Sequence, residues 1–592
     1  MKQFLLTMAG VVAGLMIFFV GLPLMLILSA LSAPKPSPAA SVLDLDLRRS
    51  MSDQDSQNPL ALLGKRALST MSIAESLRRA ETDSRVKGLL IRLPEGGLGP
   101  GEADELRLAV KHFRAAGKPV FAHSQGLYPS GAVTSTYMLG ASADQLWMQP
   151  GSSFEAVGLA AEEIFFKRLF DKYGVKADYQ QRYEYKTAVN PYLYDDFTAA
   201  HKESQLSWMG SIYETAVRTA ALDRHQAPAA LQKTLEGGPY PADQAKTLGL
   251  IDQVGQVKDA ETAILARAGK GAKLLDFADY AANAKRSEDG SGSAIAVVYG
   301  EGDIVTGDSG SGSVVGASQT MYSDEVSKAI YDAIDDNDVK AIVFRVSSPG
   351  GADTASEQIL AAVRAAKAAG KPIVISMGEY GASGGYWISS QASAILAEPT
   401  TLTGSIGVYG GKLAVGQALG RFGVDLRQLR VGGAYAGSYS SGSEFTPEQK
   451  AAFSKSIDLV YDGFIQRVAD GRRMTPDRVR QIAKGRVWTG EQAYGLGLVD
   501  QLGGFYDAVD KAKALAGLKG EVRLKRMGSP KSTLEALSRV FSADAASLNG
   551  LVRLGRTLSD TRVEGVMDQV EMARLRAVGA GDVLAPLPFS WR

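Results

Sequence analysis

The sequence carries one stretch twice, as "DSRVKGLLIRLPEGG" at residues 83–97 and as "DNDVKAIVFRVSSPGG" at residues 336–351. In both, an apolar run of strand length ends in a loop with two adjacent glycines, which is typical of a buried strand in a parallel sheet. A second strand-and-loop run follows each one, "AAGKPVFAHSQGLYPSG" (115–131) and "AAGKPIVISMGEYGASGG" (368–385), after a helical pattern. Strands that alternate with helices predict an α/β fold.

The match between the two halves extends well beyond these strands. Ser130 and Ser383 are separated by 253 residues, as are the other matched positions of these runs, so no gap is needed. Further on, "QAKTLGLIDQVG" (244–255) matches "QAYGLGLVDQLG" (492–503) with a slightly different separation. A constant order of matches with small insertions indicates an internal duplication.

We therefore predict two tandem domains, at 56–283 and 294–515, joined by the polar, Gly/Ser-rich segment 284–293. Residues 516–592 are predicted to form a helical extension that has no counterpart in the first copy.

Composition excludes several functional classes. The chain has 592 residues, of which 45% are hydrophobic and 22% are charged, with a formal net charge of +1. This balance gives no electrostatic reason to expect nucleic acid as a partner. The absence of cysteine excludes disulfides, thiol chemistry and cysteine-based metal sites. We predict neither a metal nor a cofactor.

The N-terminal segment 1–33 has the composition of a membrane anchor. Residues 4–33 carry no charge, and a bilayer core requires about 20 apolar residues in a helix. Lys2 is the only charged side chain before this run, which favours a cytoplasmic N-terminus and places the rest of the chain outside the inner membrane. Residues 34–55 are predicted to be an extended linker.

The second copy contains two glycine-rich loops that belong together. "VSSPGG" (346–351) and "YGASGG" (380–385) each follow an apolar strand, and the carboxyl ends of neighbouring parallel strands meet at one edge of a sheet. Ser383 is then either a helix N-cap in a tight turn or a nucleophile next to the backbone N–H groups that acyl transfer requires. Gly350 and Gly351 allow another part of the backbone to approach closely.

A nucleophilic serine needs a base, and none of the four histidines has the sequence context of a catalytic triad. A buried lysine is an alternative, since burial lowers its pKa and leaves a neutral amine that accepts a proton. Lys186 lies among tyrosines in "RYEYKTAVNPYLYDDF" (182–197), and its counterpart in the second copy is Tyr435. The first copy thus has the lysine, and the second has the complete pair of glycine loops.

Four motifs together resemble signal peptide peptidase A, the bacterial protease IV, in its long, duplicated form. They are "RVSSPGG", "YGASGGYWIS", "TLTGSIGVYG" and "YKTAVNPY". The resemblance implies that Ser383 is the nucleophile and Lys186 the general base of a dyad shared between the copies. It also implies an oxyanion region at Gly350, Gly351 and Gly384, although which N–H groups serve there is open. Ser405, in "TGSIG", is a candidate hydroxyl for orienting the lysine.

The resemblance further implies two Clp protease/crotonase-like domains of ββα type behind a transmembrane helix. Members of this family are similar in being serine endopeptidases anchored in the bacterial inner membrane, with most of the chain on the periplasmic side. The implied substrates are signal peptides released from preproteins and other short apolar peptides, and the implied assembly is a homotetramer.

Three alternatives stay open at this point. Ser130 occupies the position equivalent to Ser383 in the copy that carries Lys186, although "YPSGA" has a proline before the serine and one glycine fewer after it. A crotonase-like acyl-CoA enzyme would use the same fold and loops with carboxylates as acid and base. A membrane-anchored scaffold without catalysis would use only the duplicated fold.

Overall fold

The computed structural model describes residues 15, 18–19, 38–49, 51–55, 68–283, 292–309, 320–520 and 522–528. The predicted anchor at 1–33 lies outside the described residues, apart from three positions, and so does the part of the predicted extension beyond 528. Among the described helices, none combines the length and the apolar character that crossing a bilayer requires.

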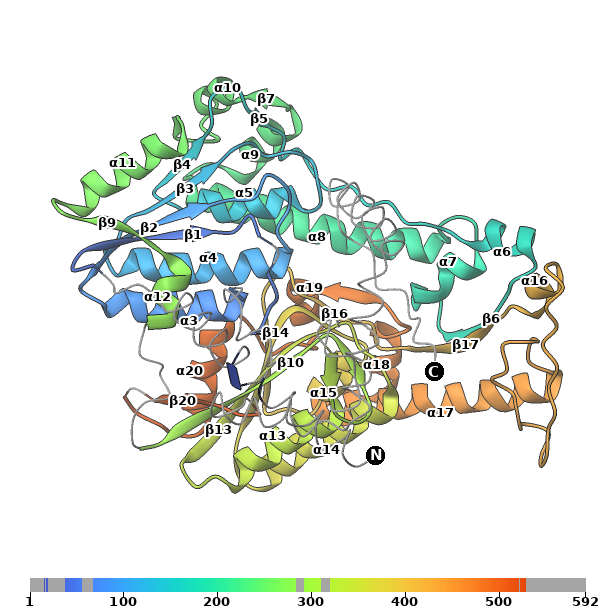
Figure 1. The fold of residues 1–592 in the computed structure, drawn as a ribbon. Helices are drawn as coiled ribbons and strands as arrows, with labels where there is room; N and C mark the ends of the chain where they lie inside the picture. The colour runs from blue at the N-terminus through green and yellow to red at the C-terminus, as the bar shows by residue number, and fades with distance from the viewer. Residues whose placement is uncertain are drawn as a thin grey trace.

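The first copy is built on a six-stranded sheet with the order β8-β4-β3-β2-β1-β9, in which every neighbouring pair is parallel (Figure 1). Its strands are rich in Val, Leu and Ile and are buried on both faces, as expected for a parallel sheet between helices. The elements of this copy are β1 (Ser41–Asp46), α3 (Thr70–Thr82), β2 (Val86–Arg92), α4 (Pro100–Ala115), β3 (Val120–Ser124), α5 (Val133–Ala141), β4 (Gln145–Met148), β5 (Ser153–Phe154), α6 (Lys167–Tyr173), β6 (Lys176–Arg182), α7 (Asn190–Leu193), α8 (Ala199–Asp223), α9 (Pro228–Glu236), β7 (Tyr240–Pro241), α10 (Ala242–Thr247), β8 (Gln253–Val254), α11 (Val257–Ala268), β9 (Lys273–Asp276) and α12 (Phe277–Asn283).

The second copy repeats this plan in an eight-stranded sheet. Its main path is β18-β16-β14-β13-β10-β20, and β15 and β19 continue from β14 as a branch. The elements are β10 (Ala294–Glu301), β11 (Asp303–Val305), β12 (Thr320–Tyr322), α13 (Ser323–Asp335), β13 (Val339–Ser348), α14 (Asp353–Ala368), β14 (Ile373–Ala382), α15 (Gly384–Ser389), β15 (Ala394–Ala397), β16 (Leu402–Gly404), β17 (Val408–Ala414), α16 (Gly416–Gly420), α17 (Pro447–Arg472), α18 (Pro476–Ile482), β18 (Val487–Thr489), α19 (Gly490–Gly495), β19 (Gln501–Leu502), α20 (Phe505–Leu515) and β20 (Arg523–Arg526).

Two boundaries predicted from the sequence are wrong. Residues 34–55 were expected to be a linker, but Ser41–Asp46 form β1, an inner strand between β2 and β9. Residues past 515 were expected to lack a counterpart, but Arg523–Arg526 form β20, which pairs with β10 as β9 pairs with β1. Both segments are short, and the charged residues in "SVLDLD" and "RLKR" mask their apolar character in a sequence pattern.

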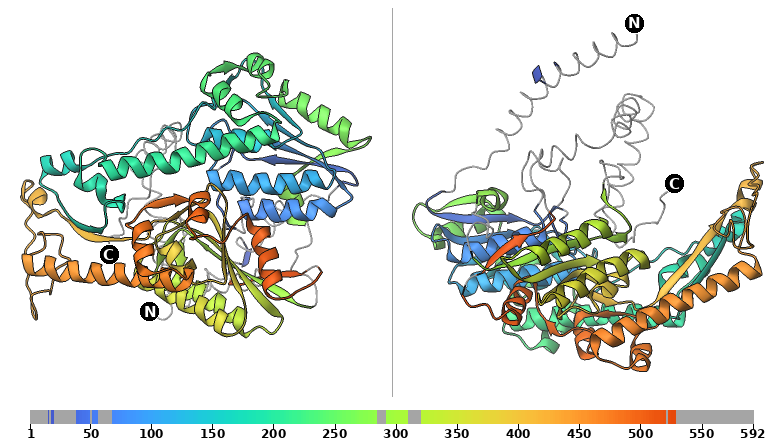
Figure 2. Two further views of the ribbon diagram at one scale, coloured as in Figure 1. Left: turned by 180° about the vertical axis from the view of Figure 1, so that it is seen from behind. Right: turned by 90° about the horizontal axis from the view of Figure 1, so that it is seen from below.

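The two copies exchange contacts along an arm that projects away from both sheets (Figure 1). Strand β6 of the first copy pairs antiparallel with β17 of the second, from Lys176 opposite Ala414 to Arg182 opposite Val408. The long helices α8 and α17 extend into this arm, as the view from behind shows (Figure 2, left). A capping box fixes the N-terminus of helix α17. The Thr446 hydroxyl accepts a hydrogen bond from Gln449 N–H, and the Gln449 side chain accepts one from Thr446 N–H.

A second contact between the copies is buried and charged. Arg345 of β13 is fully buried and binds Asp53 at 2.6 Å and Glu105 of α4 at 2.8 Å. Glu379 of β14 accepts hydrogen bonds from the N–H groups of Gly101 and Glu102, at the first turn of α4. Strand β14 of the second copy thereby caps the N-terminus of helix α4 of the first copy.

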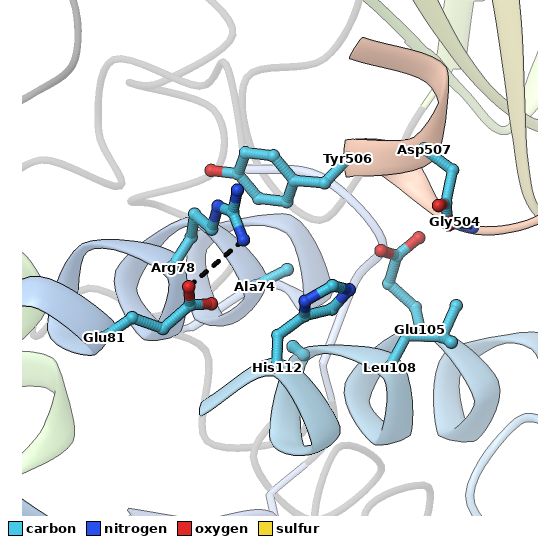
Figure 3. A pocket seen from close by; sticks show the side chains of 10 residues that line it. Ala74, Arg78, Glu81, Glu105, Leu108, His112, Gly504, Tyr506 and Asp507 are labelled. Atoms are coloured by element: carbon cyan, nitrogen blue, oxygen red, sulfur yellow. Dashed lines mark hydrogen bonds and ion pairs between the residues drawn. The ribbon is translucent and has the colours of Figure 1, made fainter. Parts of the chain in front are cut away.

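A small pocket opens at the same junction, between α3, α4 and the start of α20 (Figure 3). On one side of it Arg78 pairs with Glu81 at 3.1 Å. None of the residues that line this pocket is a predicted site residue; the lining is Ala74, Arg78, Glu81, Glu105, Leu108, Ala109, His112, Gly504, Tyr506 and Asp507.

Candidate active site

Ser383 lies on the sharp turn between β14 and α15. Its backbone has φ 53° and ψ −117°, a conformation that a residue with a Cβ adopts only when the surroundings enforce it. Two hydrogen bonds fix the turn: Ser383 N–H donates to Gly404 O at 2.9 Å, and Trp387 N–H donates to Ser383 O at 2.8 Å. Ser383 occupies the N-cap position of α15, but its hydroxyl makes no capping hydrogen bond to that helix.

Lys186 reaches Ser383 from the other copy. Only 4% of the residue is exposed, and its Nζ lies 2.9 Å from Ser383 Oγ, 2.9 Å from Ser405 Oγ and 2.9 Å from Ser405 O. Burial lowers the pKa of the Lys186 ammonium from its ordinary value of 10.5 to about 7. The amine is therefore available in its neutral form near neutral pH.

The arm explains how a residue of the first copy arrives at this place. Pairing of β6 with β17 ends with Arg182 opposite Val408, three residues after Ser405. The chain then turns, and Lys186 stands just before a short 3₁₀ turn at Thr187–Val189. Ser405 faces it with φ 48°, another backbone conformation that is unfavourable for a residue with a side chain.

The glycine loop of residues 350 and 351 packs against Ser383. A Cβ on Gly350 would lie 2.7 Å from Ser383 Cβ, so only glycine fits there. Gly350 N–H donates to Ser348 Oγ at 3.1 Å, which occupies this donor. Gly351 forms a parallel bridge with Ile304, made by Ile304 N–H to Gly350 O and Ala352 N–H to Ile304 O.

In this bridge pattern the Gly351 N–H points away from Ile304. A Cβ on Gly384 would lie 3.0 Å from Gly351 N, so these two glycines are adjacent. Gly384 is the first residue of α15, and a first-turn N–H has no acceptor within its own helix. Gly351 and Gly384, rather than Gly350, therefore supply a pair of N–H groups next to the serine.

Ser130 is not brought to the lysine. Its N–H donates to Tyr128 O and its carbonyl accepts from Gly97 N–H, so it sits in the equivalent turn of the first copy. Within the described part of the chain, the side-chain hydrogen bonds of Lys186 go only to Ser383 and Ser405.

The turn at residues 484–486 of the second copy, which packs against the backbone of Lys186, was not predicted from the sequence. Its signal is weak, because "AKGRVW" (483–488) contains a single glycine and aligns with the different sequence "LEGGPY" (235–240) in the first copy. No cluster of three or more His, Asp or Glu side chains suited to a metal ion occurs in the segments that the structure describes.

Comparison with known proteins identifies the family of this chain. The family described as "Peptidase family S49" matches residues 112–271 and 365–519, once in each copy. "Protease 4" of Salmonella typhi is 35% identical over 81% of this chain and 79% of its own length. "Protease 4" of Haemophilus influenzae is 32% identical over 78% of this chain and 75% of its own length. "Serine protease SPPA, chloroplastic" of Arabidopsis thaliana is 26% identical over 92% of this chain and 80% of its own length.

A duplicated α/β chain with these relatives is a serine-type peptidase, a hydrolase. It belongs to peptidase family S49, and its relatives place it with the long form of signal peptide peptidase A.

Proposed function

We propose that this protein cleaves peptides with a Ser/Lys dyad in which Ser383 is the nucleophile and Lys186 the general base. The observation that carries the proposal is the 2.9 Å distance from Lys186 Nζ to Ser383 Oγ at a buried position. The lowered pKa of Lys186, about 7, supports it, because a base works best when its pKa lies near the working pH.

In the proposed first step, neutral Lys186 Nζ takes the hydroxyl proton as Ser383 Oγ attacks the scissile carbonyl carbon. The carbonyl oxygen becomes an oxyanion, which the N–H groups of Gly351 and Gly384 receive. Collapse of this intermediate breaks the C–N bond, and the Lys186 ammonium gives its proton to the leaving amine. The product of this step is an ester of Ser383.

In the second step a water molecule gives a proton to Lys186 Nζ and attacks the ester carbonyl. The C–O bond to Ser383 breaks, the serine recovers its proton, and a carboxylic acid leaves. Ser405 contributes two oxygens to the surroundings of Nζ, its hydroxyl and its carbonyl, and so restricts where the amine points.

We further propose signal peptides and other short apolar peptides as substrates, with the chain anchored in the inner membrane by residues 1–33 and facing the periplasm as a homo-oligomer. The resemblance of the motifs supports this assignment, as does the uncharged run at residues 4–33. Deletion of residues 1–33 should release the protein from sedimented membranes while peptide cleavage is retained. Retention of the truncated chain in the membrane fraction would contradict the proposed anchor.

The mechanism is tested by substitution in the full chain. Ser383→Ala and Lys186→Ala should each reduce cleavage of a fluorogenic apolar peptide by about 10³-fold or more, and Ser383→Ala should abolish labelling by a fluorophosphonate. Ser130→Ala is the matched control and should keep both activities. Full activity of Ser383→Ala together with an inactive Ser130→Ala would move the site to the first copy.

A further inference from the structure

The turn at Lys484–Gly485–Arg486 joins α18 to β18 in the second copy and touches the first copy on both sides of Lys186. Lys484 O accepts hydrogen bonds from the N–H groups of Tyr183 and Tyr185, each at 3.2 Å. Its Nζ lies 3.0 Å from Glu184 Oε1. Three successive residues just before Lys186 are thus bound by one residue of the other copy.

Gly485 lies directly against the backbone of the lysine. A Cβ added there would fall 2.5 Å from both Lys186 Cα and Lys186 N, a separation that real Cβ atoms do not show. The residue has φ 84°, which glycine adopts without strain, and its N–H donates to Ile406 O at 2.8 Å. No side chain fits between the turn and Lys186.

Arg486 connects the turn to the other partner of the lysine. Its carbonyl accepts from Ser405 N–H at 2.7 Å, which helps to hold the strained Ser405 in place. Its guanidinium makes two hydrogen bonds to Glu203 of α8, at 2.6 and 2.7 Å, and stacks on the Tyr185 ring at 4.9 Å. The side chain is only 16% exposed, so these contacts are partly shielded from water and salt.

We propose that residues 484–486 form a positioning turn that seats Lys186 against Ser383 and Ser405, with Gly485 and Arg486 as its positioning residues. This inference rests on the proposed Ser/Lys dyad. The turn acts through the lysine, since it does not bind the reacting atoms. Its contacts go to neighbours of the dyad in both copies, which are Tyr183, Glu184, Tyr185 and Glu203 in the first copy and Ser405 N–H and Ile406 O in the second.

Two consequences distinguish positioning from general support of the fold. A base displaced by about 1 Å loses roughly 10²-fold in rate although substrate still binds. If the turn holds Lys186 less tightly, water also reaches the amine, and hydration raises the pKa of the lysine from its lowered value. The rate should then fall on the acid side, because only the neutral amine accepts the serine proton.

Gly485→Ala is the first test, with Gly517→Ala as its matched control. Gly517 has φ 66° and no atom within 4 Å of an added Cβ, so its substitution carries the same kind of backbone strain without a clash. We expect Gly485→Ala to shift the acidic limb of the pH profile for fluorophosphonate acylation upward by about one pH unit or more. Its kcat for a fluorogenic peptide should fall about tenfold or more with little change in KM. Gly517→Ala should match the parent chain in both.

Arg486→Ala is the second test, for the case that Gly485→Ala fails to fold. It keeps the carbonyl bond to Ser405 but removes the link to Glu203 and Tyr185. We expect an upward shift of the acidic limb by about half a pH unit, partly restored in Arg486→Lys, which keeps one cation near Glu203. Arg478→Ala, on the exposed face of α18 with its side chain bonded to Gln481, is the control and should leave the limb unchanged.

The results of these experiments distinguish an error in the proposed dyad from an error in the proposed positioning turn. If Ser383→Ala and Lys186→Ala stay active, the dyad itself is wrong. If both are inactive but Gly485→Ala and Arg486→Ala keep the acidic limb of the parent chain, the dyad stands and the positioning turn is overturned. A folded Gly485→Ala with an upward-shifted limb, next to an unchanged Gly517→Ala, supports the inference.

Discussion

Lys186 is buried although its side chain is normally charged. Burial makes the neutral amine available as a proton acceptor, and it also lowers the stability of the fold. Burial lowers its pKa to about 7, and its hydrogen-bond partners among the described residues are serine oxygens, with no acidic side chain. The same absence of a counter-ion leaves the ammonium form poorly stabilised.

Peptide cleavage should follow this titration. Below about pH 7 the Lys186 amine is protonated and cannot accept the serine proton, so kcat/KM should fall about tenfold for each further unit of acidification. A profile of kcat/KM measured from about pH 5 to pH 9 on a neutral substrate checks this. An acidic limb centred near pH 10, the ordinary lysine range, would show that Lys186 is solvated in solution.

Removal of the lysine should stabilise the fold while it abolishes activity. The folded-state pKa lies below the unfolded value of 10.5, so the stability contribution of this group is present above about pH 10.5 and is lost as pH falls through about 7. Lys186→Met removes the buried ionisable group. The free energy of unfolding at pH 7, measured by thermal denaturation, should rise by on the order of 1 to 3 kcal/mol.

The comparison for Lys186→Met is the same pair of chains near pH 10.5, where the gain should shrink because the lysine is neutral in the folded protein and about half neutral in the unfolded chain. Equal gains at both pH values would attribute the effect to packing of the methionine instead.

At the scale of elements, the antiparallel pair β6 and β17 brings Lys186 of the first copy to Ser383 of the second. The ladder runs over seven residues in each strand and ends close to the site. Gly411 permits the close approach of the two strands, since an added Cβ would lie 2.5 Å from Tyr179 Cα at a φ of 148°.

Gly411→Ala should therefore separate the ladder and displace Lys186. We expect cleavage to fall about tenfold or more, with only a small change in melting temperature because the arm lies outside the two sheet cores. Gly420→Ala, at a position with open space around an added Cβ, serves as the control and should behave as the parent chain. Unchanged cleavage by a folded Gly411→Ala would mean that the ladder does not set the position of the base.

The elements also show how far sequence reasoning reaches. The repeated apolar runs and glycine loops predicted β2, β3, β13 and β14 and the site-bearing turns, because buried parallel strands carry a strong apolar pattern. Strands β1 and β20 were not predicted, since two of the six residues of β1 and three of the four residues of β20 are charged. Lys186 and Ser383 are far apart in the sequence. They were paired only because the first copy has the lysine and the second has both glycine loops, and because the motifs resemble those of the family. The turn at 484–486 acts mainly through backbone groups, which leave little trace in a sequence.

At the scale of the whole molecule, the two copies are joined by buried carboxylates as well as by the arm. Glu379 accepts two N–H groups of α4, and burial, reinforced by nearby carboxylates, raises its pKa to about 7. A carboxyl group with a raised folded-state pKa contributes stability that is fully present below about pH 4.5 and is lost as pH rises through about 7.

Glu379→Gln keeps an oxygen acceptor for the N–H groups of Gly101 and Glu102 and removes the titration. We expect it to unfold at higher denaturant concentration than the parent chain at pH 8, by roughly 2 kcal/mol, with a much smaller gain at pH 5. Urea unfolding at the two pH values measures this. A gain that is the same at both pH values would show that the pKa of Glu379 is not raised in the folded protein.

The sharing of Lys186 and Ser383 between copies has a consequence for the order in which the chain is made. The two residues are 197 positions apart, and the ribosome releases the lysine long before the serine. The first copy emerges with a serine turn at Ser130 but without a partner amine, and the second copy completes its sheet only when β20 has been synthesised. If the proposed dyad carries the activity, the nascent chain is inert toward itself and its neighbours until nearly all of the described fold exists.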